Sequence, residues 1–166
     1  MTTSDQKSEL YGAIVGKNRR DYYLERFLSF DERGGGLFPS WNFAAFFFSG
    51  LWALYRKMYA VFLGTLGIAI AWEVISGAMR LEGLLYNLFY LVLWIAYGVY
   101  GNSLYHRHAL KQMAKARSDS DETLARQLSV QSKGGVNRWV FFIIPTVFIA
   151  GVLAGILVPA YQDYTI

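Results

Sequence analysis

The sequence predicts an all-α membrane protein with three transmembrane helices plus one interfacial or re-entrant helix. Two features carry this prediction: long apolar runs and the placement of the basic residues. Three runs of about 20 residues contain no Lys or Arg: Met58 to Met79, Leu84 to Tyr105 and Trp139 to Val158. At about 1.5 Å of rise per residue, each run as a helix matches the roughly 30 Å hydrocarbon layer of a bilayer. A soluble domain of 166 residues has no core large enough to hide three such helices.

The basic residues predict how these helices are oriented. Residues 1–57 carry eight Lys and Arg and residues 106–138 carry seven, whereas the connection between the first two runs has only Arg80. Basic residues near membrane ends stay in the cytoplasm. We therefore expect a multi-pass protein with a cytoplasmic N-terminus and a periplasmic C-terminus. Because the basic residues flank the apolar runs, the +4 charge favours a bilayer with anionic headgroups as partner, and no nucleic acid.

Five segments follow from this layout. They are residues 1–39, a cytoplasmic helix (Leu10 to Phe30) and a Gly-rich connector; 40–57, the interfacial or re-entrant helix; 58–105, a two-span helical hairpin; 106–138, a basic cytoplasmic loop that begins as helix from Arg107 to Arg117; and 139–166, the third span with a short periplasmic tail.

The segment 40–57 is the most unusual part of the chain. Ser40 is well placed to cap a helix that begins at Trp41. Only about 15 apolar residues precede Arg56 and Lys57, roughly 22 Å of helix, which is short for a span. The alternative is a short fourth span, but it would put these two basic residues outside and reverse everything after them. The charge rule disfavours that alternative.

This segment and the end of the second run resemble a family of small bacterial membrane proteins, the domain of unknown function 2628, over about residues 11–110. The matching residues are Ser40-Trp41-Asn42, Ala44-Ala45-Phe46-Phe47-Phe48, Gly50 and Trp52-Ala53-Leu54-Tyr55-Arg56-Lys57-Met58-Tyr59, then Tyr100-Gly101-Asn102-Ser103 and Tyr105 to His108. Within them, the interfacial signature is Trp41, Asn42, Trp52, Arg56 and Lys57. The sequence departs from the family pattern at Phe43, where Trp is expected, and at Leu51, where Pro is expected. A missing Pro predicts a less kinked helix. The resemblance implies the bacterial inner (cytoplasmic) membrane and no assigned activity.

The C-terminal helix resembles the N-terminal membrane helix of type IV pilins, through Pro159-Ala160-Tyr161-Gln162-Asp163-Tyr164. Two departures speak against a processed pilin: Asn137-Arg138 does not suit the peptidase site, and Phe142 stands where an acidic residue is expected. The resemblance implies either contact with pilus machinery or a shared way of leaving a membrane.

Few residues are candidates for chemistry. Glu73 is the only charged residue inside a predicted span, which makes it a functional candidate, although it can also reach the headgroups or pair with Arg80. Gly151 and Gly155 form a Gly-x-x-x-Gly pair, and Gly64 and Gly67 a comparable stripe, which are candidates for close helix contacts. The sequence indicates no catalytic, cofactor-binding or metal-binding set: it has no Cys, and His106 and His108, two apart on a helix, point away from each other.

These observations favour a binding protein over an enzyme. We expect an accessory, assembly or partner-binding component of the bacterial envelope, linked to type IV pilus machinery if the pilin-like helix is functional. Its partner would be another membrane protein or a second copy of the chain. The alternative is a small transporter or channel-like protein that uses Glu73.

Overall fold

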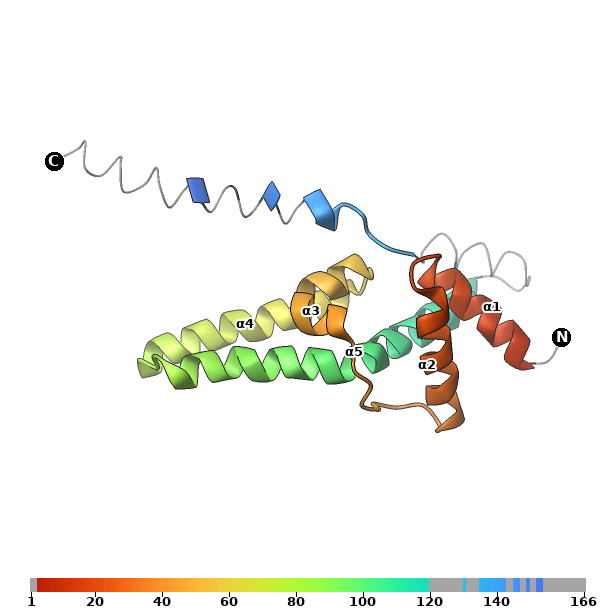
Figure 1. Ribbon diagram of the computed structural model, residues 1–166, viewed down its shortest axis with the longest axis horizontal. Coiled ribbons are helices and arrows are strands. Elements are labelled where there is room, and N and C mark those ends of the chain that lie inside the picture. Colours follow the sequence, from red (N-terminus) through yellow and green to blue (C-terminus); the bar gives the residue numbers. More distant parts are fainter. Residues whose placement is uncertain are drawn as a thin grey trace. The chain divides into compact units, whose positions relative to one another are not determined.

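The computed structural model describes residues 3–119, residue 130, residues 135–142 and five positions beyond them (145, 146, 149, 152 and 153). Its regular elements are all helices: α1 (Thr3–Val15), α2 (Arg20–Glu32), α3 (Phe43–Tyr55), α4 (Tyr59–Met79) and α5 (Leu84–Asp119) (Figure 1). Within the described residues, α4 and α5 are long and apolar enough to cross a membrane, whereas α3 is shorter. The all-α prediction is therefore confirmed for this part of the chain. Most of the expected third span, including Gly151 and Gly155, lies outside the described residues.

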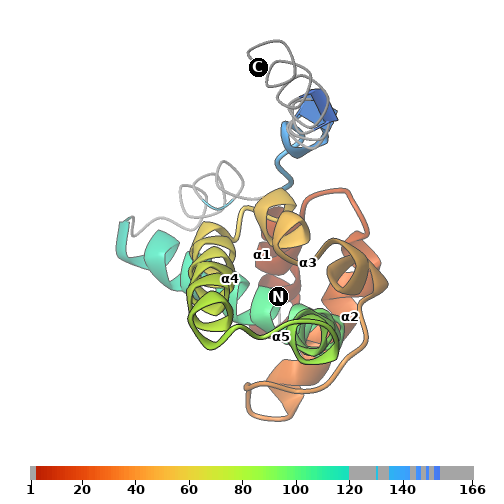
Figure 2. The same ribbon diagram turned by 90° about the vertical axis from the view of Figure 1, so that its left-hand side faces the viewer.

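Helices α4 and α5 form an antiparallel hairpin (Figures 1 and 2). Arg80 ends α4 because its backbone is left-handed (φ 52°), and Leu81 N–H closes the turn on Ser76 O at 2.8 Å. Side chains join the two helices: Trp72 stacks on Phe89 with ring centroids 4.4 Å apart, and the hydroxyls of Thr65 and Tyr97 are hydrogen-bonded. Large apolar side chains remain exposed along both helices, among them Leu63, Ile70, Val74, Leu84, Leu85 and Val92. An exposed apolar surface of this kind is typical of a lipid-facing helix pair.

Helix α5 continues without a break beyond the second apolar run. Its 36 residues correspond to about 54 Å, far more than the hydrocarbon layer. The helix expected from Arg107 to Arg117 is confirmed, as the direct continuation of the preceding run.

The N-terminal part differs from the single helix expected from Leu10 to Phe30. Helix α1 already begins at Thr3, and α1 and α2 are separated at Gly16 (φ 71°) and Arg19 (φ 56°). The left-handed backbone at Gly16 costs little because glycine has no Cβ, and it lets the chain turn back so that α2 packs on α1. Both helices also pack on α5, around an aromatic core of Tyr11, Tyr23, Phe27 and Tyr105.

Helix α3 differs from expectation in two respects. It begins at Phe43, because Asn42 is the capping residue instead of Ser40: its side-chain oxygen accepts from Ala45 N–H at 3.0 Å. It is also kinked at Ser49, whose φ of 40° and ψ of −115° are not helical. The prediction of a less kinked helix was therefore wrong: the break does not need a proline, because Gly50 follows and the Ser49 hydroxyl bonds back to Phe46 O.

The residues from Asn137 onward form a second compact unit. In its described part, Asn137 accepts from Trp139 N–H at 3.2 Å, and Thr146 Oγ1 donates to Phe142 O at 2.7 Å. The side chains of Trp139, Phe141 and Phe142 are exposed.

Candidate functional site

Two asparagines bring together sequence blocks that lie 60 residues apart. Asn42 Nδ2 donates to Asn102 Oδ1 at 2.8 Å, and both side chains are buried. Asn102 Nδ2 in turn donates to Ser40 Oγ at 3.0 Å and Tyr22 Oη at 3.1 Å. A buried amide is costly to desolvate unless its donors and acceptors are satisfied. The pair therefore fixes the start of α3 to one position on α5 and to α2.

The segment that leads into α3 is extended and lies along α5. Phe38 N–H donates to Ser103 Oγ at 3.0 Å, Ser40 N–H to Val99 O at 2.8 Å, and Asn42 N–H to Gly98 O at 2.7 Å. The partner residues Ser103, Val99 and Gly98 lie progressively closer to the hairpin turn, so the segment follows α5 toward that turn as it approaches α3. Side-chain and backbone groups of α5 thus replace the water that an extended backbone otherwise needs.

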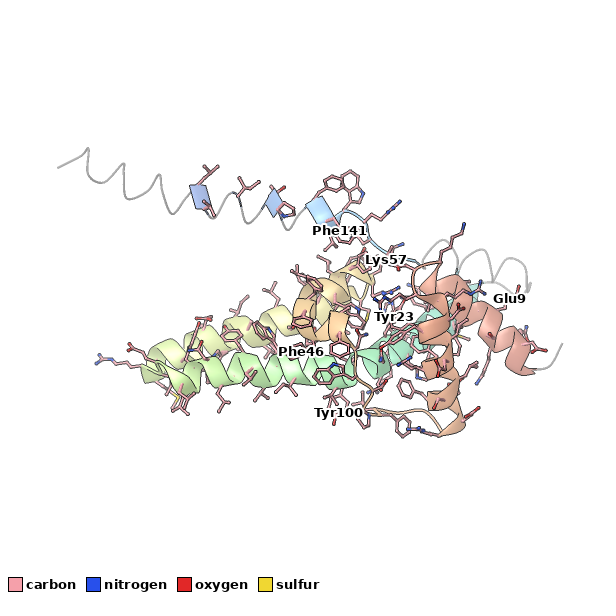
Figure 3. The ribbon with its side chains drawn as sticks, in the orientation of Figure 1. Glu9, Tyr23, Phe46, Lys57, Tyr100 and Phe141 are labelled. Atoms are coloured by element: carbon pink, nitrogen blue, oxygen red, sulfur yellow. The ribbon has the colours of Figure 1, made fainter. Side chains whose placement is uncertain are left out.

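Two glycines of α5 make room for this docking. A Cβ at Gly101 would lie only 2.6 Å from Ala45 Cβ, and one at Gly98 would lie 3.1 Å from Phe46 Cβ. Side chains cannot approach so closely, and α3 therefore packs almost directly on the α5 backbone. Phe46, labelled in Figure 3, lies at this contact and reaches the ring of Trp94 (centroids 6.5 Å apart).

Arg56 anchors the other end of α3. Its side chain is buried, with the guanidinium 4.4 Å from the centroid of Tyr23 and 5.3 Å from that of Tyr105. It also donates to Val15 O at 3.4 Å and Asn18 O at 3.3 Å. Aromatic faces attract a guanidinium through their quadrupole, most strongly where water is excluded. Arg56 thus ties α3 to the loop between α1 and α2 and to α5.

A second polar cluster lies among α1, α2 and α5, which we call the Tyr11–Asp31–His106 cluster. His106 Nε2 lies 3.0 Å from both Tyr11 Oη and Asp31 Oδ1, and Tyr11 Oη donates to Asp31 Oδ2 at 2.9 Å. Lys7 forms an ion pair with the same carboxylate at 3.0 Å. The Tyr11 hydroxyl already donates its hydrogen bond to Asp31, and an ionised carboxylate can only accept. We therefore assign the hydrogen atom between the imidazole and these two oxygens to Nε2 of His106.

The environment of this cluster shifts its titrations. Burial raises the pKa of the Asp31 carboxyl, but hydrogen bonds from Lys7 and Tyr11 and the Lys7 charge lower it more, so the net pKa is below its ordinary value. Burial raises the pKa of Tyr11, and its bond to Asp31 adds to this, so the phenol remains a donor. Burial also lowers the pKa of His106, which lies just after the expected second span, although Asp31 opposes that shift.

Glu73 occupies the opposite end of the hairpin. Its carboxylate accepts from Tyr86 Oη at 2.8 Å and also from the Tyr90 hydroxyl, so it is held across the hairpin by α5. The sequence suggested the headgroups or Arg80 as its partners, but the two tyrosines of the second run bind it instead. Tyr86 and Tyr90 are four positions apart, which puts both on one face of α5. The sequence does contain this spacing as a signal for a shared partner.

The remaining predicted site residues fall into two groups. Asn42, Trp52 and Arg56 are buried and contact α5, whereas Trp41 is partly exposed and Lys57 follows the helix end with φ 59°. In contrast, a Cβ at Gly64 or Gly67 would meet no described atom within 4 Å. Among the described residues, close backbone contact is therefore made by Gly98 and Gly101, and the Gly64–Gly67 stripe of α4 is open.

The Tyr11–Asp31–His106 cluster was not predicted from the sequence. In the sequence, His106 was considered as a metal ligand, whereas in the structure its side chain is fully buried. No local pattern could have found this cluster, because its members are separated by 20 to 95 positions and meet only in the folded chain. The separation of His106 from His108 is as expected, since His108 stacks on Tyr105 instead.

Comparison with known proteins supports the resemblance seen in the sequence. The family model of proteins of unknown function DUF2628 matches residues 10–111, well over half of the chain. The chain belongs to the DUF2628 family. The match covers α2, α3 and α4, the last six residues of α1, and α5 up to Lys111. It therefore includes every contact described above for the Asn42–Asn102 pair and Arg56. No curated protein and no solved structure matches the chain significantly.

Proposed function

We propose that this DUF2628 protein is a small polytopic inner-membrane protein that acts as an accessory, assembly or partner-binding component of the bacterial envelope. The observation that carries the proposal is the continuity of α5, which runs as one helix from the hairpin turn into the packed N-terminal helices. The buried contacts of Asn102, Tyr105 and His106 hold α1, α2 and α3 to this helix. Such a connection keeps a cytoplasmic surface in a fixed orientation to the membrane, as an adaptor requires.

The proposed topology has three spans, α4, the first part of α5 and the run from Trp139 to Val158. The N-terminus and the 106–138 loop are cytoplasmic and the C-terminus is periplasmic. The distribution of basic residues supports this arrangement. A periplasm-reporting fusion after Ile166 should be active, and one in the 118–135 loop silent. The reverse pattern would overturn the orientation.

Partner binding is tested by affinity purification of the tagged chain in mild detergent, followed by mass spectrometry. Gly151→Leu with Gly155→Leu should leave the protein abundant but remove a partner bound through the third span, because large side chains prevent close helix contact. If the glycines only complete the helix bundle, the same change should lower the amount of folded protein. Unchanged pilus assembly and motility in a deletion strain of a piliated host would exclude the link to pilus machinery.

The second candidate is a small transporter or channel-like protein. Glu73 favours it, because a carboxylate in an apolar helix, held by two tyrosine hydroxyls, is a group that can bind or release a proton or cation. Under this proposal, Glu73→Gln should abolish ion flux in reconstituted vesicles. Under the first proposal, Glu73→Gln should leave partner co-purification unchanged.

A further inference from the structure

Residues 37–57 run along α5 toward the hairpin turn and then return to the level of α5 at which they began. The extended segment descends from Ser103 through Val99 to Gly98, and α3 starts there. The helix then returns: Ala45 packs on Gly101, Trp52 lies against Gly101 and Tyr105, and Arg56 lies against Tyr105. Both ends of the segment are thus on the same side of the hairpin. This path is that of a re-entrant segment and not that of a span.

The depth of this path can be measured against α5. The deepest described contact of α3 is that of Phe46 with Trp94, eleven residues before Tyr105, where the second apolar run ends. Eleven residues of helix are about 16 Å, half of the roughly 30 Å hydrocarbon layer. On α4, a Cβ at Gly50 would contact Phe62 and Thr65, three and six residues after the helix start at Tyr59, which is about 5–9 Å along that helix. The segment therefore lies within one leaflet, with the Phe46 side chain as its deepest described contact.

The outer face of α3 is suited to acyl chains. The side chains of Phe43, Phe47 and Phe48 are 68%, 68% and 58% exposed, and no charged residue occurs between Ser40 and Arg56. The hairpin likewise exposes apolar side chains, such as Tyr59 and Leu63 at the start of α4. In the extended segment that precedes α3, the backbone N–H groups of residues 38, 40 and 42 all bond to α5. Non-helical backbone at membrane depth is tolerated only where other parts of the protein form hydrogen bonds with its N–H and C=O groups in this way.

We propose that residues 37–57 form a wedge in the cytoplasmic leaflet, with the Phe43–Phe47–Phe48 face against acyl chains, and that the protein thereby favours membranes in which this leaflet is expanded. The inference rests on the proposed function for the placement of α4 and α5 in the bilayer. In the cytoplasmic leaflet the described chain occupies the cross-section of three helices, and in the other leaflet that of two. A protein of this shape fits best where the leaflet holding α3 is convex, since lipids there are spread apart.

The depth of the wedge is tested with the full chain, which has no cysteine and therefore accepts single labels. Phe47→Cys, with Val74→Cys on the far half of α4 as a control, is labelled with a fluorophore and reconstituted in vesicles of zwitterionic and anionic phospholipids. Both positions are exposed, so the label should not disturb the fold. Quenchers placed along the acyl chain should reach the label at Phe47 most strongly in the middle of the chain. The adjacent contacts on α5, Gly98 and Gly101, lie seven and four residues, about 6–10 Å, inside the end of the second apolar run at Tyr105. Strongest quenching by a quencher at the terminal methyl would show that α3 spans the bilayer, and would overturn the wedge.

The two proposals fail in different ways in this experiment. If α4 does not cross the membrane, the label at Val74 will not be quenched by any lipid, and the proposed function fails. If only the wedge is wrong, the label at Val74 is quenched as expected, while the label at Phe47 is quenched at the bilayer centre or only by a water-soluble quencher.

The preference for curvature is tested by orientation in vesicles of different size. In small, highly curved vesicles the outer leaflet is expanded, so the wedge should favour insertion with the N-terminus outward. The ratio of protease-accessible to protected N-terminal tags should rise roughly twofold or more from large to small vesicles, as expected for a modest population shift. Phe43→Ser with Phe47→Ser should remove this rise, and Leu84→Ser with Leu85→Ser, on the exposed start of α5, should retain it. An equal ratio in both vesicle sizes for the unchanged protein would overturn the proposal.

Discussion

The two halves of the hairpin are held together in different ways. In the half next to α3, residues 97–106 of α5 contribute five buried side chains that are polar or carry a hydroxyl, namely Tyr97, Asn102, Ser103, Tyr105 and His106. In the half next to the turn, the described contacts across the hairpin are those of Glu73 with two tyrosines and of Trp72 with Phe89. The first half specifies one arrangement of helices through hydrogen bonds of Tyr97, Asn102, Ser103 and His106 Nε2, although the Tyr105 hydroxyl and His106 Nδ1 have no hydrogen-bond partner among the described residues. The second half needs only length and apolar surface.

Removing the side-chain amide of Asn102 tests the difference between the two halves most strongly. Asn102→Leu should lower the free energy of unfolding by about 3 kcal/mol, because it leaves the buried Asn42 amide nitrogen with only its longer bond to Tyr23 Oη at 3.4 Å. The measurement is denaturant unfolding in detergent micelles. Asn87→Leu is the matched control, since the amide of Asn87 is exposed and donates to Gly83 O in the turn just before α5. Equal losses for both variants would contradict the special role of the α3 half.

A smaller effect is expected at the other end of α3. Arg56→Lys should cost about 1–2 kcal/mol, because an ammonium keeps the charge but loses the planar stacking on Tyr23 and Tyr105. Thermal unfolding in the same micelles measures this loss. Arg80→Lys, at the exposed hairpin turn, should change stability little. If Arg56→Lys is equally neutral, the aromatic contacts do not anchor α3.

The Tyr11–Asp31–His106 cluster predicts a dependence on pH. Because the pKa of His106 is lowered in the fold, the unfolded chain binds more protons below about pH 6.5. Stability that is present above this pH should therefore fall on acidification, and the unfolding temperature should drop between about pH 7.5 and about pH 5.5. Asp31 adds a second loss below about pH 3.8, as protonation removes a carboxylate whose pKa is lowered by its partners.

His106→Gln separates these two losses. An amide still donates to Asp31 but does not titrate, so the drop between about pH 7.5 and about pH 5.5 should become smaller while the loss at lower pH remains. The remaining part of the drop comes from His108, whose pKa is also lowered by burial. The residues that face His106 here are Tyr11 and Asp31, with Lys7 bound to the same carboxylate. A slope in the variant as steep as in the unchanged protein would place the titration elsewhere.

The smallest effect is expected in the turn half. Glu73→Gln keeps an oxygen that can accept from Tyr86 and Tyr90, so the free energy of unfolding should change by less than about 0.5 kcal/mol. Unfolding in micelles again measures this value, with Asn102→Leu as the reference for a large effect. A loss as large as that of Asn102→Leu would show that the two halves are specified alike.

The same comparison explains what the sequence could predict. The length of α4 and the start of α5 follow from runs of neighbouring apolar residues, a local property. The candidate spans from Tyr59 and from Leu84 begin at or within one residue of the expected runs. The capping residue and kink of α3 were missed, because Asn42 is selected over Ser40 by its contact with Asn102, far along the chain. Likewise, the small-residue spacing of Gly64–Gly67 and Gly98–Gly101 is similar, and only the fold shows that α3 packs on the second pair.

The docking of residues 38–42 on α5 also has a consequence for how the chain is made. The carbonyl groups that accept from Ser40 and Asn42 belong to Val99 and Gly98, which the ribosome adds almost 60 residues later. At about 5–20 residues per second, this interval lasts roughly 3–12 s. During it, the aromatic segment is already synthesised while its backbone partners do not yet exist. If residues 37–57 form the proposed wedge, their backbone must stay in water at the bilayer surface until α5 is inserted, and the segment enters the membrane only afterwards.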